Sequence, residues 1–256
     1  MNHLNGLSDT AQIVKRNVKR NFRIPQLLIF SSIQPIVFLL LFNFVFGGAV
    51  KTGEPKYIDF LLPGILAQTA LFGAIQTGVG LAEDLSKGVI DRLRSLPIAR
   101  SAVLVGRTFA DTIRNIFVIA LMCIVGVLLG FRFHEGIPKF LLALVLVLFF
   151  AYSFSWVSGN IGLLLKDSET VQVAGFLWVF PLVFASSVFV PVETMPHWLQ
   201  IFARNQPVTQ VVNAVRYLTQ GNIINGGAYV WHTLVWALGI FLVFAPLAVW
   251  KYKRTV

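Results

Sequence analysis

Side chains that could carry out chemistry are few in this sequence, and they form none of the common catalytic or metal-binding patterns. The four histidines, His3, His134, His197 and His232, lack the spacing of metal ligands. The chain has no Gly-x4-Gly-Lys-Ser/Thr loop for nucleotide phosphates and no Gly-x-Ser-x-Gly nucleophile turn. The single cysteine, Cys123, lies in an apolar run and cannot form a disulfide within the chain. We therefore expect no catalytic residue, no metal site and no cofactor in this chain.

A segment of mixed charge, residues 83–100, is the first polar feature that is longer than a simple connection requires. Its charged and turn-forming residues are Glu83, Asp84, Lys87, Gly88, Asp91, Arg92 and Arg94. Apolar residues recur between them at helical spacing, at Leu85, Val89, Leu93 and Leu96, which predicts a short amphipathic helix that ends at Pro97. Such a helix offers a surface that a soluble partner can bind. The alternative is a solvated connector that lies on the lipid head groups.

A second long segment, residues 192–228, is too apolar for a free loop and too interrupted by prolines to cross a membrane. Its conspicuous residues, with the proline that precedes it, are Pro191, Met195, Pro196, Trp198, Phe202 and Pro207. The apolar spacing predicts two short helices, broken near residues 205–207, that dip into the outer leaflet and pack against the bundle. The alternative is an aromatic anchor at the membrane interface.

Asp111 and Arg114 are ionisable residues within an apolar run, three positions apart. This spacing places them on one face of a helix, where they can form an ion pair. Ionisable groups in membrane helices are candidates for function. Because both lie toward the end of the run, we favour a structural ion pair.

The elements that position these residues must be membrane helices, because hydrophobic residues make up 56% of the chain and charged residues only 12%. A helix rises about 1.5 Å per residue, so about 20 apolar residues cross the roughly 30 Å hydrocarbon core. The apolar runs predict six transmembrane helices, at residues 26–47, 58–82, 107–130, 139–165, 171–191 and 229–250. The fold class is therefore all-α and polytopic, with one transmembrane domain over residues 26–256.

Residues 1–25 predict an amphipathic helix that lies in the membrane interface. Its apolar stripe comprises Leu7, Ala11, Val14, Val18 and Phe22, and basic residues cover the rest of the circumference. The alternative is an ordinary basic anchor. Lys and Arg are concentrated in this segment, at residues 83–107 and after residue 250, which predicts that these parts and both termini are cytoplasmic. Because the basic residues lie at span ends and not on one soluble face, the net charge of +10 does not indicate nucleic-acid binding.

Two stretches together resemble the permeases of type-2 ATP-binding-cassette (ABC) exporters. Residues 87–97, KGVIDRLRSLP, are similar to the family's loop between spans two and three. Residues 189–191 (FVP), 195–199 (MPHWL), 206–209 (QPVT) and 214–216 (AVR) are similar to its signature before the last span. The resemblance covers nearly the whole chain and extends to the daunorubicin-resistance permeases of actinobacteria. The wider family often has Asn-Pro where this chain has Gln206-Pro207.

The resemblance implies a multi-pass permease of the bacterial plasma membrane with no ATPase activity of its own. Two copies, or this chain and a sister permease, would pair among membrane lipids, and each would dock a cytoplasmic ATPase that holds ATP and magnesium. The coupling segment would be residues 83–106, with docking contacts from Glu83, Asp84, Lys87, Gly88, Asp91, Arg92 and Arg94. The outer hairpin, with the six residues named above for it, would cap the exit.

Cargo and mechanism are constrained less directly. The predicted span interiors are rich in Phe and Leu with few hydrogen-bonding groups, which favours an amphiphilic or hydrophobic, drug-like or lipid-like substrate. Export of a polysaccharide or lipid-linked glycan by the same architecture is the alternative. An ion-coupled secondary transporter would need acidic or histidine residues at the midplane and internal repeats. A membrane-embedded enzyme would need a cluster of Asp, Glu or His at one interface. We find neither pattern.

Overall fold

The computed structural model describes residues 12–15, 17–18, 25–50, 56–89, 100–221, 223 and 225–255. All regular structure within these residues is helical, as the hydropathy pattern predicts. The named elements are α2 (Pro25–Leu41), the π-helical turn η1 (Phe42–Phe46), α3 (Tyr57–Ser86), α5 (Arg100–Leu128), α6 (Gly136–Leu165), α7 (Ser168–Phe184), the 3₁₀ turn η2 (Val192–Thr194), α8 (His197–Asn205), α9 (Pro207–Gln220) and α10 (Gly226–Thr255).

Four helices of the described chain are long and apolar enough to cross a membrane: α3, α5 from Leu104, α6, and α10 to Tyr252. Two shorter apolar helices, Ser31–Phe46 and Ser168–Phe184, overlap the first and fifth predicted spans, and the fifth ends at Phe184, seven residues before the predicted end at residue 191. The chain is thus a polytopic, all-α membrane protein. The helix ends differ from the predicted span ends, since α3 continues to Ser86 and α5 already begins at Arg100. Both flanks of the predicted coupling segment 83–106 therefore belong to long helices.

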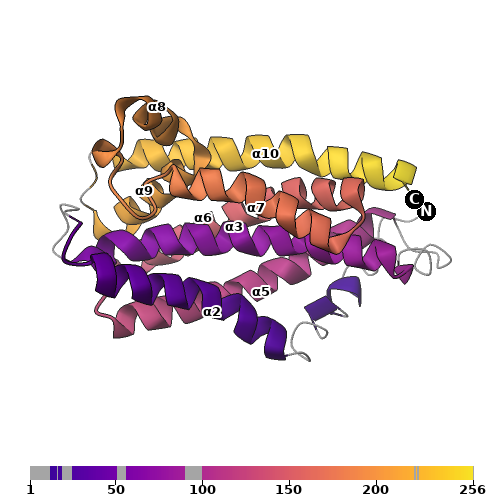
Figure 1. The fold of residues 1–256 in the computed structure, drawn as a ribbon, viewed down its shortest axis with the longest axis horizontal. Helices are drawn as coiled ribbons and strands as arrows, with labels where there is room; N and C mark the ends of the chain where they lie inside the picture. The colour runs from indigo at the N-terminus through magenta and orange to yellow at the C-terminus, as the bar shows by residue number, and fades with distance from the viewer. Residues whose placement is uncertain are drawn as a thin grey trace.

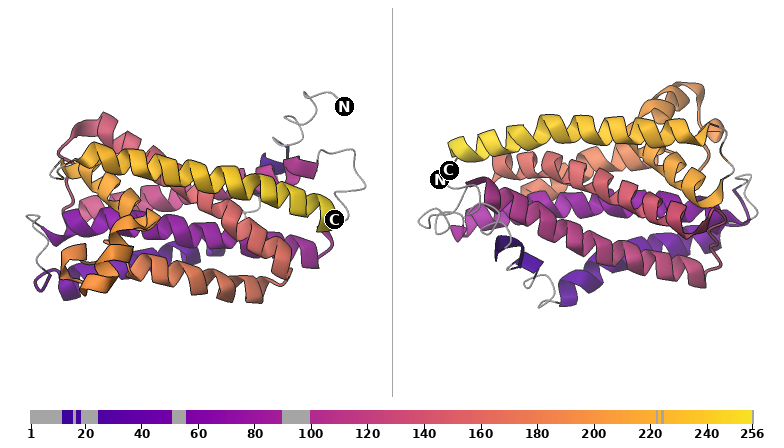
Figure 2. Two further views of the ribbon diagram at one scale, coloured as in Figure 1. Left: turned by 90° about the horizontal axis from the view of Figure 1, so that it is seen from above. Right: turned by 180° about the vertical axis from the view of Figure 1, so that it is seen from behind.

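The helices form an elongated bundle in which successive long elements run in alternate directions (Figure 1). The α8–α9 segment lies at one end, which we call the hairpin end, and α10 finishes at the other, which we call the tail end (Figures 1 and 2). α3 runs through the middle and packs against α5, α6, α7 and α9. Its most apolar stretch is 89% buried, against 22% for α10 at the side of the bundle. α3 is therefore the most buried of the four long helices, and α10 packs on α6 and α9.

The two described fragments of the N-terminal segment pack on the tail end of the bundle. Ile13 is buried in a cluster with Leu81 of α3, Leu104 of α5 and Tyr252 of α10. The face that packs inward is centred on Ile13 and Asn17, one position before the predicted stripe at Val14 and Val18. The remaining residues of the predicted stripe lie outside the described residues. Residues close to both ends of the chain therefore lie at the same end of the bundle.

α3 and α6 come unusually close because glycines face each other at their crossing. A Cβ atom on Gly78 of α3 would overlap the carbonyl oxygen of Ser158 in α6. A Cβ atom on Gly162 of α6 would overlap the carbonyl oxygen of Gly78. In a bilayer the hydrophobic effect does not drive helices together, so van der Waals contact between close backbones is a main source of association. The glycine contact fixes the distance between the central helix and α6.

The connection between α6 and α7 is tight. Lys166 ends α6 in the left-handed conformation, and Asp167 begins α7 by accepting hydrogen bonds from the backbone and the hydroxyl of Thr170 at 2.8 and 2.6 Å. These hydrogen bonds lower the pKa of Asp167 below its ordinary value. The turn therefore sends α7 back toward the hairpin end immediately after α6 (Figure 1).

Candidate functional site

The mixed-charge segment begins on the last turn of α3, not on a separate loop. Glu83 and Lys87 lie one helical turn apart and form an exposed ion pair. α3 ends at Ser86, and Gly88, just after the cap residue Lys87, has a φ of +64°, in the left-handed region that favours glycine. Asp91, Arg92 and Arg94 lie outside the described residues. The described part of the proposed docking surface is therefore attached rigidly to the central helix.

Asp84 faces the opposite way, into the bundle. Arg107 Nη1 lies 2.5 Å from Asp84 Oδ2, and Arg107 Nε lies 3.4 Å from Asp111 Oδ2. Arg114 Nη1 lies 3.4 Å from Asp111 Oδ1. We call Asp84, Arg107, Asp111 and Arg114 the charge cluster. All four side chains are about nine-tenths buried or more, so a docking contact from Asp84 requires its pairing with Arg107 to open.

Gly80 of α3 makes room for the centre of the charge cluster. A Cβ atom at this position would overlap Nη2 of Arg107. The guanidinium plane therefore lies against the bare backbone of α3, where it reaches Asp84 on the same helix. A planar guanidinium presents several donors at once, which lets one residue bridge two carboxylates.

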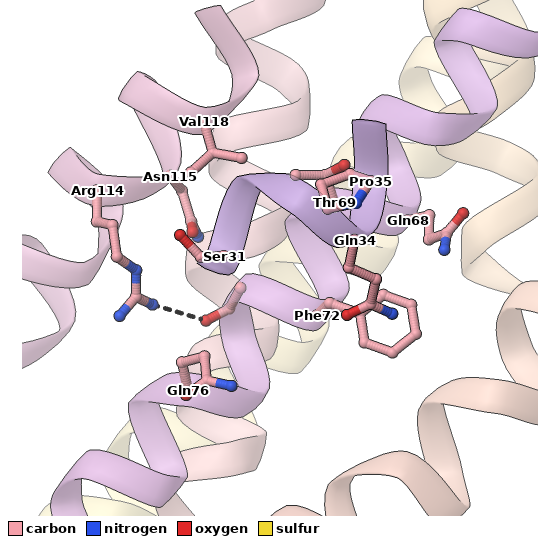
Figure 3. Close-up of a pocket in the computed structure, with 11 residues that line it drawn as sticks. Ser31, Gln34, Pro35, Gln68, Thr69, Phe72, Gln76, Arg114, Asn115 and Val118 are labelled. Atoms are coloured by element: carbon pink, nitrogen blue, oxygen red, sulfur yellow. Dashed lines mark hydrogen bonds between the residues drawn. The ribbon is translucent and has the colours of Figure 1, made fainter. Parts of the chain in front are cut away.

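The charge cluster leads directly to a polar pocket between α2, α3 and α5 (Figure 3). Arg114 Nη2 donates a hydrogen bond of 3.2 Å to the carbonyl oxygen of Gly73, and both residues line the pocket. The cavity has a volume of about 60 Å³. Its lining is Ser31, Gln34 and Pro35 from α2, Gln68, Thr69, Phe72, Gly73 and Gln76 from α3, and Arg114, Asn115 and Val118 from α5. A row of contacts thus runs from the exposed end of α3 to a polar cavity inside the bundle.

The sequence analysis identified part of this site and missed the rest. Asp111 and Arg114 lie as the three-residue spacing suggests. Arg107, which we assigned to the cytoplasmic charges at a span end, is 6% exposed and central to the cluster. Its spacing of four from Asp111 was a usable signal. The pocket amides had no such signal, because glutamines on two helices and an asparagine on a third meet only in the folded bundle.

The segment of residues 192–228 contains the two predicted helices, broken at Gln206. The Gln206 side chain accepts a hydrogen bond from Val208 N–H and donates to the carbonyl of Leu182, which ties the break to the end of α7. α9, from Pro207, is buried almost throughout. α8 exposes its apolar stripe, with Trp198 72% and Phe202 46% exposed.

The other residues assigned to this segment, Pro191, Met195 and Pro196, lie around η2 just before α8, where they are half-buried or exposed. η2 contacts α8, so the turn and the helix form one surface feature. The exposed positions of this feature are compatible with contact to lipid or to a second subunit. Its role as an exit cap stays a prediction.

Arg216 of α9, within the 214–216 stretch of the family signature, holds the hairpin end together. It is 3% exposed and donates hydrogen bonds to the carbonyls of Phe60 at 2.9 and 3.0 Å and of Ser187 at 2.6 Å. Its guanidinium also lies 3.5 Å from the centre of the Phe60 ring. One side chain thus joins α9 to α3 and to the segment that follows α7.

Comparison with known proteins agrees with this architecture. The family model of the ABC-2 type transporter matches residues 9–219. The daunorubicin resistance ABC transporter permease protein DrrB1 of Streptomyces coeruleorubidus is 34% identical over 90% of this chain and 81% of its own length. The probable doxorubicin resistance permease DrrC of Mycobacterium tuberculosis is 29% identical over 88% of this chain and 80% of its own. The putative transport permease ycf38 of Cyanophora paradoxa is 29% identical over 80% of this chain and 72% of its own.

The family match covers the central helix, the charge cluster, the pocket and most of the hairpin end. The chain matches most of the length of each of these permeases, from 72% to 81%. A permease of this kind works with a separate ATPase subunit. The chain therefore belongs to the ABC-2 type transporter family, as a membrane permease and not as the ATPase itself.

Proposed function

We propose that this protein is the permease of an ATP-driven exporter that moves an amphiphilic or hydrophobic substrate across the plasma membrane. The observation that carries the proposal is the construction of α3. Its last turn exposes Glu83 and Lys87 to a partner, while the same turn points Asp84 at Arg107 inside the bundle. A partner that moves this end of α3 also moves the most buried helix of the protein. The named drug-resistance relatives support a drug-like or lipid-like cargo.

The proposed topology has six spans and an outer hairpin. α2 with η1, and α7, supply the first and fifth spans beside the four long helices. α7 has 17 residues, about 25 Å at 1.5 Å per residue, and can cross where the bilayer thins or neighbouring residues extend toward the interface. The alternating helix directions support a tail end on the cytoplasmic side and a hairpin end outside (Figure 1). The domain division proposed is an interfacial helix over residues 1–25 and a transmembrane domain over 26–256, with the hairpin at 192–228.

The ATPase is proposed to dock on residues 83–100. Glu83, Lys87 and Gly88 provide the described part of this surface, and Asp91, Arg92 and Arg94 continue it along the chain. ATP and magnesium are held by the ATPase, and the permease chain holds neither. A second permease copy or a sister permease completes the transporter.

Charge reversal at the end of α3 tests the docking proposal. In the permease expressed with its ATPase, Glu83→Lys and Lys87→Glu should each reduce co-purification of the ATPase and ATP-dependent transport at least tenfold, because a complementary contact becomes a repulsive one. The matched control is Lys139→Glu. Lys139 forms an exposed ion pair with Glu135 at the same four-residue spacing, but at the opposite end of the bundle. Full assembly and transport in the Glu83 and Lys87 variants would contradict docking at this surface.

Labelling from the two sides of the membrane tests the orientation. In a Cys123→Ala background, Lys87→Cys should react with an impermeant maleimide only in inside-out vesicles, and Trp198→Cys only in intact cells. Both positions are exposed in the folded chain, so that reaction from one side only reports the side of the membrane on which each position lies. Reaction of Lys87→Cys from outside the cell would overturn the docking proposal together with the topology.

Two other functions remain distinguishable by transport assays. Export of a polysaccharide or lipid-linked glycan would use the same architecture. Transport by the reconstituted complex, measured with ATP and each class of cargo in turn, distinguishes glycan export from export of an amphiphile. An ion-coupled secondary transporter would move cargo under an ion gradient without any ATPase. Transport by the permease alone would therefore exclude an ATP-driven exporter.

A further inference from the structure

The pocket between α2, α3 and α5 carries more hydrogen-bonding capacity than the protein itself uses. Gln68 is 1% exposed, and its Oε1 has no hydrogen-bond partner within the described chain. The structure gives no side-chain hydrogen bond to Gln34, Gln76 or Asn115 either, as far as the described residues extend. An unsatisfied buried amide costs about 1–3 kcal/mol. Gln68 carries this cost at the pocket wall, and the other amides lie around the same cavity, which indicates a ligand that pairs with them.

The charges next to the pocket are already matched to one another. The two arginines and the two aspartates of the charge cluster balance in formal charge, and Asp111 lies between Arg107 and Arg114. Arg114 is also engaged with the carbonyl of Gly73. An anion would have to displace Asp111 from Arg114, and a cation would find no uncommitted carboxylate in the described lining. The pocket therefore favours an uncharged ligand.

The remaining groups specify the kind of uncharged ligand. Each amide offers two N–H donors and a carbonyl oxygen with two lone pairs, and a hydroxyl group offers one donor and an oxygen with two lone pairs, so the two types of group complement each other. Phe72 supplies one apolar wall (Figure 3). A volume of about 60 Å³ holds several water-sized groups, too few for an oligosaccharide. Outside the pocket, α2 and α5 expose apolar side chains to the membrane, among them Ile33, Val37 and Ile116.

We propose that this pocket binds the small, uncharged, hydroxyl-bearing head of an amphiphile whose apolar part remains in the membrane along α2 and α5. The inference deepens the proposed function. It rests on that function only where it takes the bound amphiphile to be the exported cargo. The same head-group chemistry could belong to a resident neutral lipid. Arg114 belongs both to the charge cluster and to the pocket lining, so a movement of the α3 end that shifts the cluster would also reach a bound head group.

The test uses the permease–ATPase complex in nanodiscs and a photoreactive alkyl glucoside as the probe. Alkyl trimethylammonium and alkyl sulfate of the same chain length serve as charged competitors. The glucoside should label peptides from α2, α3 or α5, and only uncharged competitors should reduce the labelling. Gln68→Leu should weaken probe binding about tenfold, which corresponds to the loss of one or two hydrogen bonds.

Stability separates binding from a structural role. Gln68→Leu removes an unsatisfied buried amide and keeps a similar volume, so the melting temperature should stay the same or rise while binding falls. Gln210→Leu is the matched control, because Gln210 is also a buried glutamine with an unpartnered Oε1 but lies on α9, away from the pocket. Gln210→Leu should leave probe binding unchanged. Equal binding to wild-type and Gln68→Leu complexes, or equal competition by the charged amphiphiles, would overturn the proposal.

The source of the ligand follows from two further measurements. If the glucoside stimulates the ATPase and competes with transport in the wild type but not in Gln68→Leu, the pocket is a cargo site. If a neutral lipid co-purifies with the wild type and is lost from Gln68→Leu without a change in transport, it is a lipid site. Both outcomes support the head-group chemistry. If Gln68→Leu weakens binding of the glucoside as expected but the permease transports cargo without any ATPase, the proposed function is refuted and the pocket proposal stands.

Discussion

Replacing Arg107 with methionine should lower the free energy of unfolding by about 3–5 kcal/mol. Arg107 is the cation between the carboxylates of Asp84 and Asp111, and its removal leaves Asp84 without the closest partner it has in the cluster. Within the charge cluster, Asp111 would keep its contact with Arg114. For a chain of this length the loss corresponds to a decrease in melting temperature of roughly 6–20 °C. Thermal unfolding of the purified permease in detergent measures it.

Two further variants show whether charge is the cause. Adding Asp84→Asn to Arg107→Met should restore much of the lost stability, because Asp111 and Arg114 then remain as a matched pair and the site holds no uncompensated charge. Lys139→Met breaks the exposed pair with Glu135 and should change the melting temperature little. An Arg107→Met protein as stable as the wild type would show that the charge cluster does not stabilise the bundle.

Gly162→Ala should destabilise the bundle by about 1–3 kcal/mol, although alanine is the better helix former. The added methyl group would meet the carbonyl oxygen of Gly78 in α3, and a backbone carbonyl cannot rotate away as a flexible side chain can. The central helix and α6 would have to separate along their contact. The measurement is again the melting temperature, together with the yield of folded protein in size-exclusion chromatography.

Gly159→Ala is the matched control on the same helix. A Cβ atom at Gly159 meets nothing within 4 Å, so the variant should be neutral or gain up to about 1 kcal/mol from helix propensity. Similar losses for the two variants would show that glycine flexibility in α6, and not the close approach of α3, is what matters.

The sequence by itself determined the features that depend on local periodicity. Apolar runs of membrane-spanning length predicted the helices, because an apolar helix of about 20 residues has its backbone hydrogen bonds satisfied within itself. The pair Asp111 and Arg114 followed from helical spacing, and the break between α8 and α9 followed from Pro207. The motifs around residues 87–97 and 189–216 identified the family that the comparisons show.

Only the tertiary structure decided which faces of the helices meet. Asp84 and Arg107 lie 23 residues apart on different helices, and Arg216 reaches Phe60 across 156 residues. The amides of the pocket come from three helices whose sequences are mainly apolar, so none of them stands out alone. Hydropathy records the tendency of each helix to enter the membrane. The pairing of helices instead depends on short-range packing and hydrogen bonds between distant residues, such as the contact of Gly78 with Gly162, which no local pattern encodes.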